Sequence, residues 1–447
     1  MYNKMHSRCG TAMLLLLGGL PLAGKAQLSL SAQLRTRTEF RDGQGAPLPR
    51  SAKPAFFTSQ RTRLSAGFTT NRLKFGLSVQ DVRVWGQDVS TINKISTQDN
   101  NGLMVHEAWA EVRLTDTTSL HNLSFKIGRQ ELNYDDGRLL GNLDWLQQAR
   151  RHDALVFRYS SGSWQADVGL AYAQNREAAS GTLYQGTPPG AYPANTNGGS
   201  MYKGLQYLHI SRKNTHGQIS LLALADQFPR FHVDTIEQKP VKTYDAGVHS
   251  RFTAAAYAQQ TFGRLSLTGN VAYQGGRYAD GGTVEGWLLS GQALYAITPQ
   301  LKAGVGTDYT TGGKSGSRAK AFDPLYGTPH KFWGHMDYYY AGNTFGATGL
   351  QDYYLRFLFK PGARWSLQAD GHRFFSASSI AMHNRDYGWE ADLNAQFALT
   401  PVIGFEAGYS YYRSTLPLAA VKAVNNAARS NQWAYLMINI KPSLLLK

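Results

Sequence analysis

The chain of 447 residues carries 46 lysines and arginines against 30 aspartates and glutamates, a formal net charge of +16 with histidine neutral. Its single cysteine, Cys9, lies near the N-terminus, so the rest of the chain has no disulfide, no catalytic thiol and no cysteine-bound metal. After residue 26, no segment approaches the run of about 18 apolar residues that a membrane-spanning helix requires.

The first 26 residues have the pattern of a Sec-type secretory signal peptide. Lys4 and Arg8 precede an apolar run over residues 13–23, and small residues precede Gln27. We therefore predict cleavage after residue 26, with an N-terminal membrane anchor as the alternative. Residues 27–447 contain no linker and keep a uniform composition, which predicts a single domain.

Apolar and polar residues alternate from the start of this domain. Leu28, Leu30 and Leu34 fall on one face of the first segment, whereas Arg35 and Arg37 fall on the other. Successive side chains of a β-strand point to opposite faces, so the segment predicts a strand with one apolar and one charged side. The pattern recurs in candidate strands at residues 28–41, 56–70, 72–85, 104–115, 121–132, 152–161, 163–174, 203–213, 216–226, 246–260, 263–276, 284–297, 300–311, 351–360, 364–375, 387–400, 402–413 and 430–441.

The connections between these segments differ in length. Short turn sequences alternate with long gaps, of which residues 175–203 and 311–350 are the longest. An even count of about 18 strands with this asymmetry predicts an all-β, transmembrane antiparallel β-barrel with short periplasmic turns and long extracellular loops. A soluble β-sandwich or solenoid is the alternative, but it does not explain why the apolar faces so often end in aromatic residues: Trp85, Trp164, Tyr172, Tyr273, Trp287, Tyr295, Tyr309, Trp365, Trp389 and Tyr409.

The charged faces of such strands would line a lumen. Arginines outnumber acids on these faces, and a net positive wall in a low-dielectric tube favours anions. The alternative is that the arginines pair with acids and fill a polar interior without selecting a solute. The arginines that the alternation places along the solute path are Arg35, Arg37, Arg61, Arg63, Arg158 and Arg356.

The densest charge lies in residues 127–159, where five arginines accompany five carboxylates. Such a cluster is compatible with an acid–base site, a metal site or the wall of a channel. Because it falls between two predicted strands, we interpret it as an arginine–carboxylate network that shapes a loop or constriction. Its members are Arg129, Arg138, Arg150, Arg151 and Arg158 with Glu131, Asp135, Asp136, Asp144 and Asp153.

Other site chemistries find little support. No histidine lies in a serine-hydrolase or zinc-protease motif, so no enzyme activity, metal or cofactor is predicted. His330, His335 and Asp337 around a metal, or a cation at Asp135 and Asp136, are minor alternatives. Nucleic-acid binding is not expected, because the basic residues are dispersed and the chain carries a secretion signal.

Three stretches resemble the alginate export family of outer-membrane barrels. They are "GRQELNYDDGRLLGNLDW" followed by "RRHDAL", then "FDPLYGTPHKFWGHMDYY" and "GLQDYYLRFLFKP", the last two being similar to Bacteroidetes-type members. The resemblance implies a monomeric barrel whose arginine-rich constriction passes an acidic uronate polysaccharide. It places Arg129, Arg138 and Arg151 in that constriction, with Glu131, Asp136 and Asp153 as charge partners. The chain end "WAYLMINIKPSLLLK" departs from the terminal aromatic residue common in outer-membrane barrels.

These observations predict a passive outer-membrane channel of a Gram-negative cell. Its expected partners are membrane lipid and anionic oligo- or polysaccharides or other small anions, and its expected state is a monomer. Two alternatives remain: a plugged barrel that acts as a binding or structural protein, and a barrel hydrolase.

Overall fold

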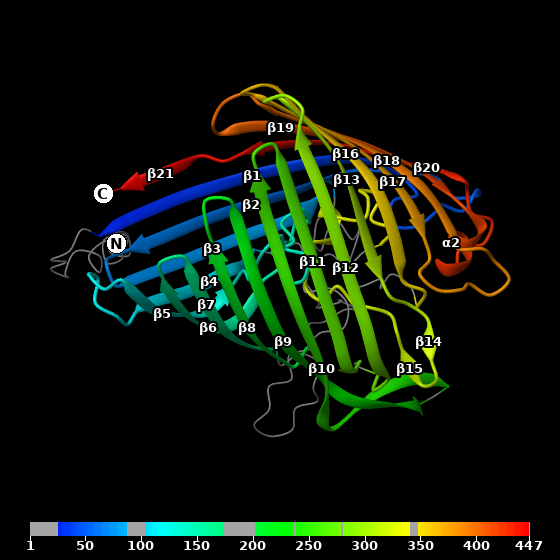
Figure 1. Cartoon of the computed structure of the whole chain (residues 1–447), viewed down its shortest axis with the longest axis horizontal. Helices are drawn as coiled ribbons and strands as arrows, with labels where there is room; N and C mark the ends of the chain where they lie inside the picture. The colour runs from blue at the N-terminus through cyan, green and yellow to red at the C-terminus, as the bar shows by residue number, and fades with distance from the viewer. Residues whose placement is uncertain are drawn as a thin grey trace, which may run out of the picture.

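The computed structural model describes residues 26–86, 103–173, 202–236, 238–278, 280–339 and 347–446. Within these ranges, 18 antiparallel strands form one closed barrel (Figure 1). The strands are β1 (Gln27–Asp42), β2 (Ala55–Thr69), β3 (Leu73–Val84), β4 (Met104–Arg113), β5 (His121–Gln130), β6 (His152–Ser161), β7 (Trp164–Tyr172), β8 (Gly204–Lys213), β9 (Gly217–Ile236), β10 (Lys239–Phe262), β11 (Leu265–Arg277), β12 (Thr283–Ala296), β13 (Leu301–Thr310), β16 (Leu350–Gly362), β17 (Trp365–Phe375), β18 (Asp386–Ala398), β19 (Ile403–Ser414) and β20 (Ser430–Ile440).

The barrel closes through its first strand. β1 pairs with β2 on one side and with β20 on the other, and each remaining barrel strand pairs with its neighbours along the chain. Beyond Pro442, β21 (Ser443–Leu446) continues the pairing with β1. In the described ranges closure therefore gives every barrel strand two neighbours, as a sheet in lipid requires.

The connections carry little regular structure. A small hairpin of β14 (Lys314–Ser315) and β15 (Arg318–Ala319) precedes the 3-10 turn η1 (Pro329–Lys331), and the short helix α2 (Leu416–Val421) follows β19. No helix in the described part of the chain is long and apolar enough to cross a membrane. The start of β1 and the end of β21 lie at one end of the barrel and α2 lies at the other (Figure 1).

Alternating side chains give the barrel two different surfaces. Leu64 and Ile127 point outward and are half exposed. Arg61, on the opposite face of β2 from Leu64, is buried inside the barrel. Most of the predicted girdle residues are exposed on the outer surface, including Trp85, Trp164 and Trp365, while Tyr273 and Tyr309 are only partly exposed. The apolar outer band and its aromatic borders are those of a membrane barrel.

The predicted strand order and the alternation of short turns with long loops are confirmed, with one difference in length. The hairpin of β9 and β10 extends well past the predicted ends at residues 226 and 246. Pro229 concealed this extension, because proline in a central strand normally removes a ladder hydrogen bond. Here the pairing of β8 with β9 ends at Gln227. Beyond that residue β9 pairs only with β10, so Pro229 removes no hydrogen bond to β8.

Candidate functional site

Two loops enter the barrel interior from the long-loop end. We call residues 131–151, between β5 and β6, loop A, and residues 320–339, between β15 and β16, loop B. Leu139 and Leu140 of loop A pack with Tyr326 and Trp333 of loop B in one buried cluster. Residues 320–339 of the predicted gap at 311–350 therefore fill part of the lumen, whereas the hairpin of β14 and β15 is largely exposed. The predicted loop at 175–203 lies almost wholly outside the described residues.

The backbones of the two loops are joined directly. Gly141 N–H donates to the Tyr326 carbonyl at 3.0 Å, and Tyr326 N–H donates to the Leu139 carbonyl at 3.0 Å. The approach is so close that a Cβ on Gly327 would lie 2.0 Å from the carbonyl oxygen of Arg138. Glycine is therefore required at this position, and the two loops form a single unit inside the barrel.

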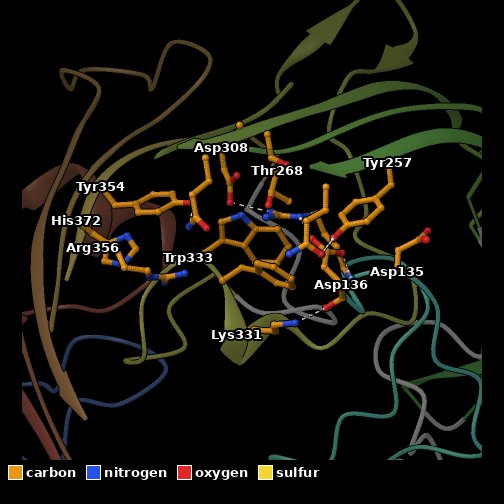
Figure 2. A pocket seen from close by; sticks show the side chains of 16 residues that line it. Asp135, Asp136, Tyr257, Thr268, Asp308, Lys331, Trp333, Tyr354, Arg356 and His372 are labelled. Carbon is orange, nitrogen blue, oxygen red and sulfur yellow. Dashed lines mark hydrogen bonds and ion pairs between the residues drawn. The ribbon is translucent and has the colours of Figure 1, made fainter. Parts of the chain in front are cut away.

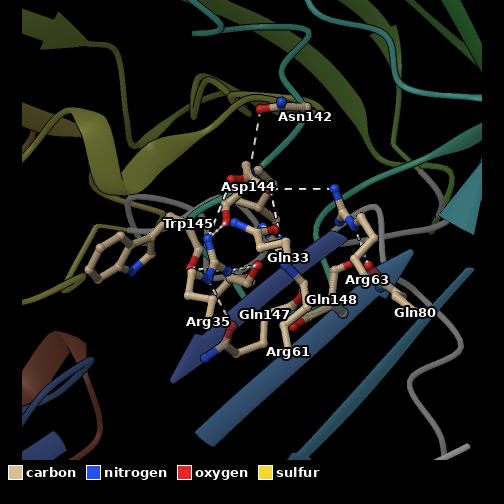
Figure 3. Close-up of polar contacts among 12 residues, drawn as sticks. Gln33, Arg35, Arg61, Arg63, Gln80, Asn142, Asp144, Trp145, Gln147 and Gln148 are labelled. Atoms are coloured by element: carbon tan, nitrogen blue, oxygen red, sulfur yellow. Dashed lines mark hydrogen bonds and ion pairs between the residues drawn. The ribbon is translucent and has the colours of Figure 1, made fainter. Parts of the chain in front are cut away.

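Arginines of β1 and β2 hold loop A against the wall (Figure 3). Arg35 donates to the Asp144 carbonyl at 2.7 Å and to the Gln147 side chain at 3.0 Å, and Arg61 donates to the Asp144 carboxylate at 2.8 Å. Arg37 donates to the carbonyl of Trp145 at 2.9 Å and lies 4.4 Å from the centre of its ring. These guanidinium groups anchor the loop.

Asp144 is the carboxylate at the centre of this anchor. Its two oxygens lie 3.3 Å from Arg35, 2.8 Å from Arg61 and 3.8 Å from Arg63. Burial alone would raise the pKa of Asp144, but the charge and hydrogen bond of Arg61, with Arg35 and Arg63, hold that pKa below its ordinary value. The carboxylate is therefore ionised at any physiological pH.

A cavity of about 250 Å³ lies between the two loops and the wall formed by β10 to β13, β16 and β17 (Figure 2). Trp333 stands at its centre, with Tyr354 and Arg356 to one side and Asp136 to the other (Figure 2). Polar groups and aromatic faces in one concave site are the usual composition of a ligand-binding cavity. The charged lining residues are Asp135, Asp136, Arg138, Asp308, Lys331 and Arg356.

The charges in this cavity are largely paired. Arg138 contacts Asp308 at 2.8 Å and Asp136 at 3.5 Å, and its guanidinium lies 3.9 Å from the centre of the Phe332 ring. Burial lowers the pKa of Arg138, but Asp308 and Asp136 outweigh this effect and raise it, so the guanidinium keeps its charge. Arg356 contacts Asp370 at 2.6 Å. The lining is thus mixed in charge and not uniformly positive.

Basic and acidic side chains are unevenly distributed around the interior. Arginines gather on β1 and β2, and carboxylates gather on β13 and β16 to β18. Among the described residues, buried carboxylates outnumber buried guanidinium groups, so the positive net charge of the chain does not extend evenly around the lumen. The acidic arc consists of Asp308, Asp352, Asp370, Glu390 and Asp392.

Most of the predicted path residues do face inward. Arg35, Arg37, Arg61 and Arg63 form the basic arc; Arg138 and Arg356 line the cavity with Asp136; and Arg158 pairs with Asp167 at 2.7 Å on the inner wall. Glu131 accepts a contact from His106 at 2.8 Å. Contact of any of these residues with cargo stays a prediction.

Arg129 and Asp153 do not line the lumen, so their predicted place in the constriction is wrong. They face each other across β5 and β6 and form a two-point ion pair at 2.8 Å. Ile127 and Phe157 are exposed on the outer surface, and a strand returns to the same face every second residue, so Arg129 and Asp153 lie outside as well. Arg151, the residue before β6, is half-buried, and burial and the charge of Arg129 lower its pKa; its place in the constriction stays a prediction.

The residues of the two possible metal sites considered from the sequence make hydrogen bonds and ring contacts within the protein. His330 binds Asp337 at 2.8 Å and stacks on Trp145 at 3.9 Å between ring centres. Asp135 accepts hydrogen bonds from His209, Gln218 and Ser220 through one oxygen. A barrel hydrolase requires a serine or aspartate within hydrogen-bond reach of a histidine. In the described ranges no serine hydroxyl is hydrogen-bonded to a histidine ring, whereas aspartates contact His209, His330 and His372, so this alternative stays a prediction.

Trp145 and Trp333 are central to the site but were not selected from the sequence, and Asp144 was named only as one of the five carboxylates of the charged stretch. Asp144 and Trp145 belong to the charged stretch, and their role in the site depends on contacts with Arg35 and Arg37, which lie more than 100 residues away in the sequence. Trp333 lies in the aromatic-rich gap. An acidic residue beside a tryptophan in a long loop indicates a site residue only if the loop is known to fold into the barrel.

Residues 26–381 match the family model described as alginate export. The chain belongs to this family. It is an outer-membrane β-barrel channel, as the resemblance of its loop sequences predicted. The more detailed Bacteroidetes-type assignment stays a prediction. No curated protein matches the chain.

Crystal structures of Pseudomonas aeruginosa proteins share the fold. OccK9 (OpdG) is 14% identical with a TM-score of 0.60, covering 93% of this chain and 98% of that chain. OccK3 (OpdO) is 12% identical with a TM-score of 0.58, covering 93% and 96%. The outer membrane protein opdK is 13% identical with a TM-score of 0.56, covering 93% and 99%. At these identities the likeness supports the barrel fold alone.

Proposed function

We propose that this member of the alginate export family conducts anionic solutes, with an acidic uronate polysaccharide as the expected cargo class. The basic arc on β1 and β2 carries the proposal. Arg35, Arg37, Arg61 and Arg63 all project into the interior, and the carboxylates beside them are Glu39, Glu131 and Asp144. A local excess of positive charge on a low-dielectric wall concentrates anions, and guanidinium groups bind carboxylates in a two-point geometry.

The proposal is tested by reversal potentials of the purified channel in planar bilayers under a salt gradient. We expect anions to permeate better than cations, and Arg63→Gln to shift the reversal potential toward cation selectivity. Arg63 is the appropriate arginine because it is the least engaged with loop A: its nearest carboxylates are 3.8 Å away. Arg129→Gln, on the outer face, is the matched control and should leave selectivity unchanged. Cation selectivity of the wild-type channel contradicts the proposal.

A barrel closed by its own loops is the second candidate, and one observation favours it. Loops A and B pack a continuous apolar cluster inside the lumen, with Leu140, Tyr326 and Trp333 fully buried. Such a barrel would act as a binding or structural protein. The same bilayer experiment separates the two candidates, because a closed barrel gives no conductance steps where a channel gives them.

A further inference from the structure

A cluster of potential metal ligands lies apart from the cavity, where β4 meets loop A. His106 and Glu107 belong to β4, and Glu131 is the first residue of loop A. One ligand atom from each of the three residues lies within 4.8 Å of the other two. No other group in the described part of the chain brings three such residues this close.

A β-bulge directs two consecutive side chains of β4 into the interior. Ser78 of β3 pairs with Glu107 and Val79 pairs with Val105, so His106 has no partner on β3. Neighbouring residues of a regular strand point to opposite faces, whereas a bulge re-aims one of them. His106 is fully buried, Val105 is exposed on the outer surface, and Glu107 reaches the backbone N–H of Glu131 at 3.2 Å. Both potential ligands therefore face inward.

The donor atoms are already positioned by neighbouring groups. His106 Nε2 lies 2.8 Å from Glu131 Oε1, and Glu131 Oε2 accepts a hydrogen bond from Asn142 at 2.9 Å. His106 Nδ1 is buried, and among the described residues it has no hydrogen-bond partner. Arg63 lies 3.8 Å from Glu131, and the charges of Glu107 and Glu131 also act on Lys126. A buried imidazole with unused coordinating capacity beside two carboxylates is a favourable environment for a cation.

We propose that His106, Glu107 and Glu131 bind one divalent transition-metal ion, with Zn²⁺ as the best fit. Calcium and magnesium prefer all-oxygen ligand sets, whereas one imidazole and two carboxylates suit zinc with a water at its fourth position. The ion would link the barrel wall to the first residue of loop A, while Arg35 and Arg61 hold the same loop at Asp144. This proposed metal site does not depend on the proposed anion selectivity of the channel.

The test uses the full protein, refolded in detergent, stripped with chelator and titrated with Zn²⁺ in a calorimeter. We expect one ion per chain and a loss of affinity on the order of 100-fold in Glu107→Gln and in His106→Gln. Zinc should also raise the apparent unfolding temperature of the wild type but not of these variants. Glu107→Gln keeps the test valid if the buried His106 variant does not refold.

His232→Gln is the control, because His232 is an exposed histidine with Asp234 and Asp245 at 3.2 and 2.9 Å and could hold zinc on the surface. It should bind Zn²⁺ as the wild type does. Absence of stoichiometric binding, binding abolished by His232→Gln and kept by Glu107→Gln, or preference for Ca²⁺ over Zn²⁺ each overturns the proposal.

Discussion

At the scale of single residues, the buried arginines of β1 and β2 depend on one loop carboxylate. Arg35 and Arg61 are almost completely buried, and each needs a counter-charge because an unpaired guanidinium in the interior is costly. Asp144 serves both, although its own side chain keeps 42% exposure to solvent. The ion pairs therefore join two buried arginines of the barrel wall to a loop carboxylate that remains accessible to water.

Asp144→Asn should weaken this anchor. Charge-assisted hydrogen bonds contribute about 1.5–3 kcal/mol, and solvent at a partly exposed carboxylate reduces the value, so we expect a loss of about 1–2 kcal/mol in the free energy of unfolding. Loop A should also move more, giving larger or noisier single-channel conductance. Asp153→Asn removes an outer-face ion pair and should leave the conductance unchanged. Identical conductance of Asp144→Asn and the wild type contradicts the assigned anchor.

The same comparison has a defined pH dependence. The pKa of Asp144 is lower in the folded chain than in the unfolded chain, so its contribution is complete above the unfolded value of about 4 and is lost as the pH falls through the folded value. The stability difference between the wild type and Asp144→Asn should therefore stay constant from pH 8 to about 5 and shrink below about 4. Denaturant unfolding at several pH values measures it.

Sequence periodicity identified these residues only in part. Alternation correctly placed Arg35, Arg61 and Arg356 on the inner face, because each lies well inside a regular strand. The same alternation places Arg129 outside, two residues after Ile127, whereas the family resemblance of the surrounding stretch places it in the constriction. Pairing partners such as Asp144 lie in another part of the chain, and no local pattern encodes a contact across such a separation.

At the scale of elements, loops A and B act as one insert because their backbones touch. The contact depends on glycine: Gly327 lies against the Arg138 carbonyl, and Gly141 would bring a Cβ within 2.4 Å of the Thr328 hydroxyl oxygen. Loop length predicted the gap at 311–350 that contains loop B, and the charged stretch that contains loop A was interpreted as a loop or constriction, but neither pattern predicted that the two would pack on each other. Whether a loop folds into a barrel is decided by contacts with the opposite wall, which the sequence does not display locally.

Gly327→Ala should separate the two loops. The added methyl group would overlap backbone and not a flexible side chain, so loop B has to shift, and we expect a cost of about 1–3 kcal/mol. The shift should increase conductance and make loop B more susceptible to protease. Gly371→Ala is the matched control, because Gly371 is a strand residue with no atom within 4 Å of the new Cβ. Protease resistance equal to that of the control contradicts the close contact.

At the scale of the whole molecule, closure of the sheet means that each barrel strand finds both of its neighbours within the same chain. β1 begins at Gln27 opposite Thr69, and it is covered on its other side by β20 and then by β21. Every barrel strand therefore has two neighbours, and the outer surface is apolar with aromatic borders. This architecture was predictable because strand period, even strand number and turn spacing all repeat along the chain.

Residues 27–447 should accordingly fold without a signal segment and without a partner chain. The first residue after the predicted cleavage site is also the first residue of β1, so removal of residues 1–26 leaves the pairing of β1 with β2 complete. Expression of the full sequence in a Gram-negative host should yield a mature protein whose N-terminal residue is Gln27, measured by intact mass. The same segment, refolded from denaturant into detergent, should elute as a monomer, because a closed barrel exposes no strand edge for association. A mature chain that keeps residues 1–26, or one that refolds only as an oligomer, contradicts this account.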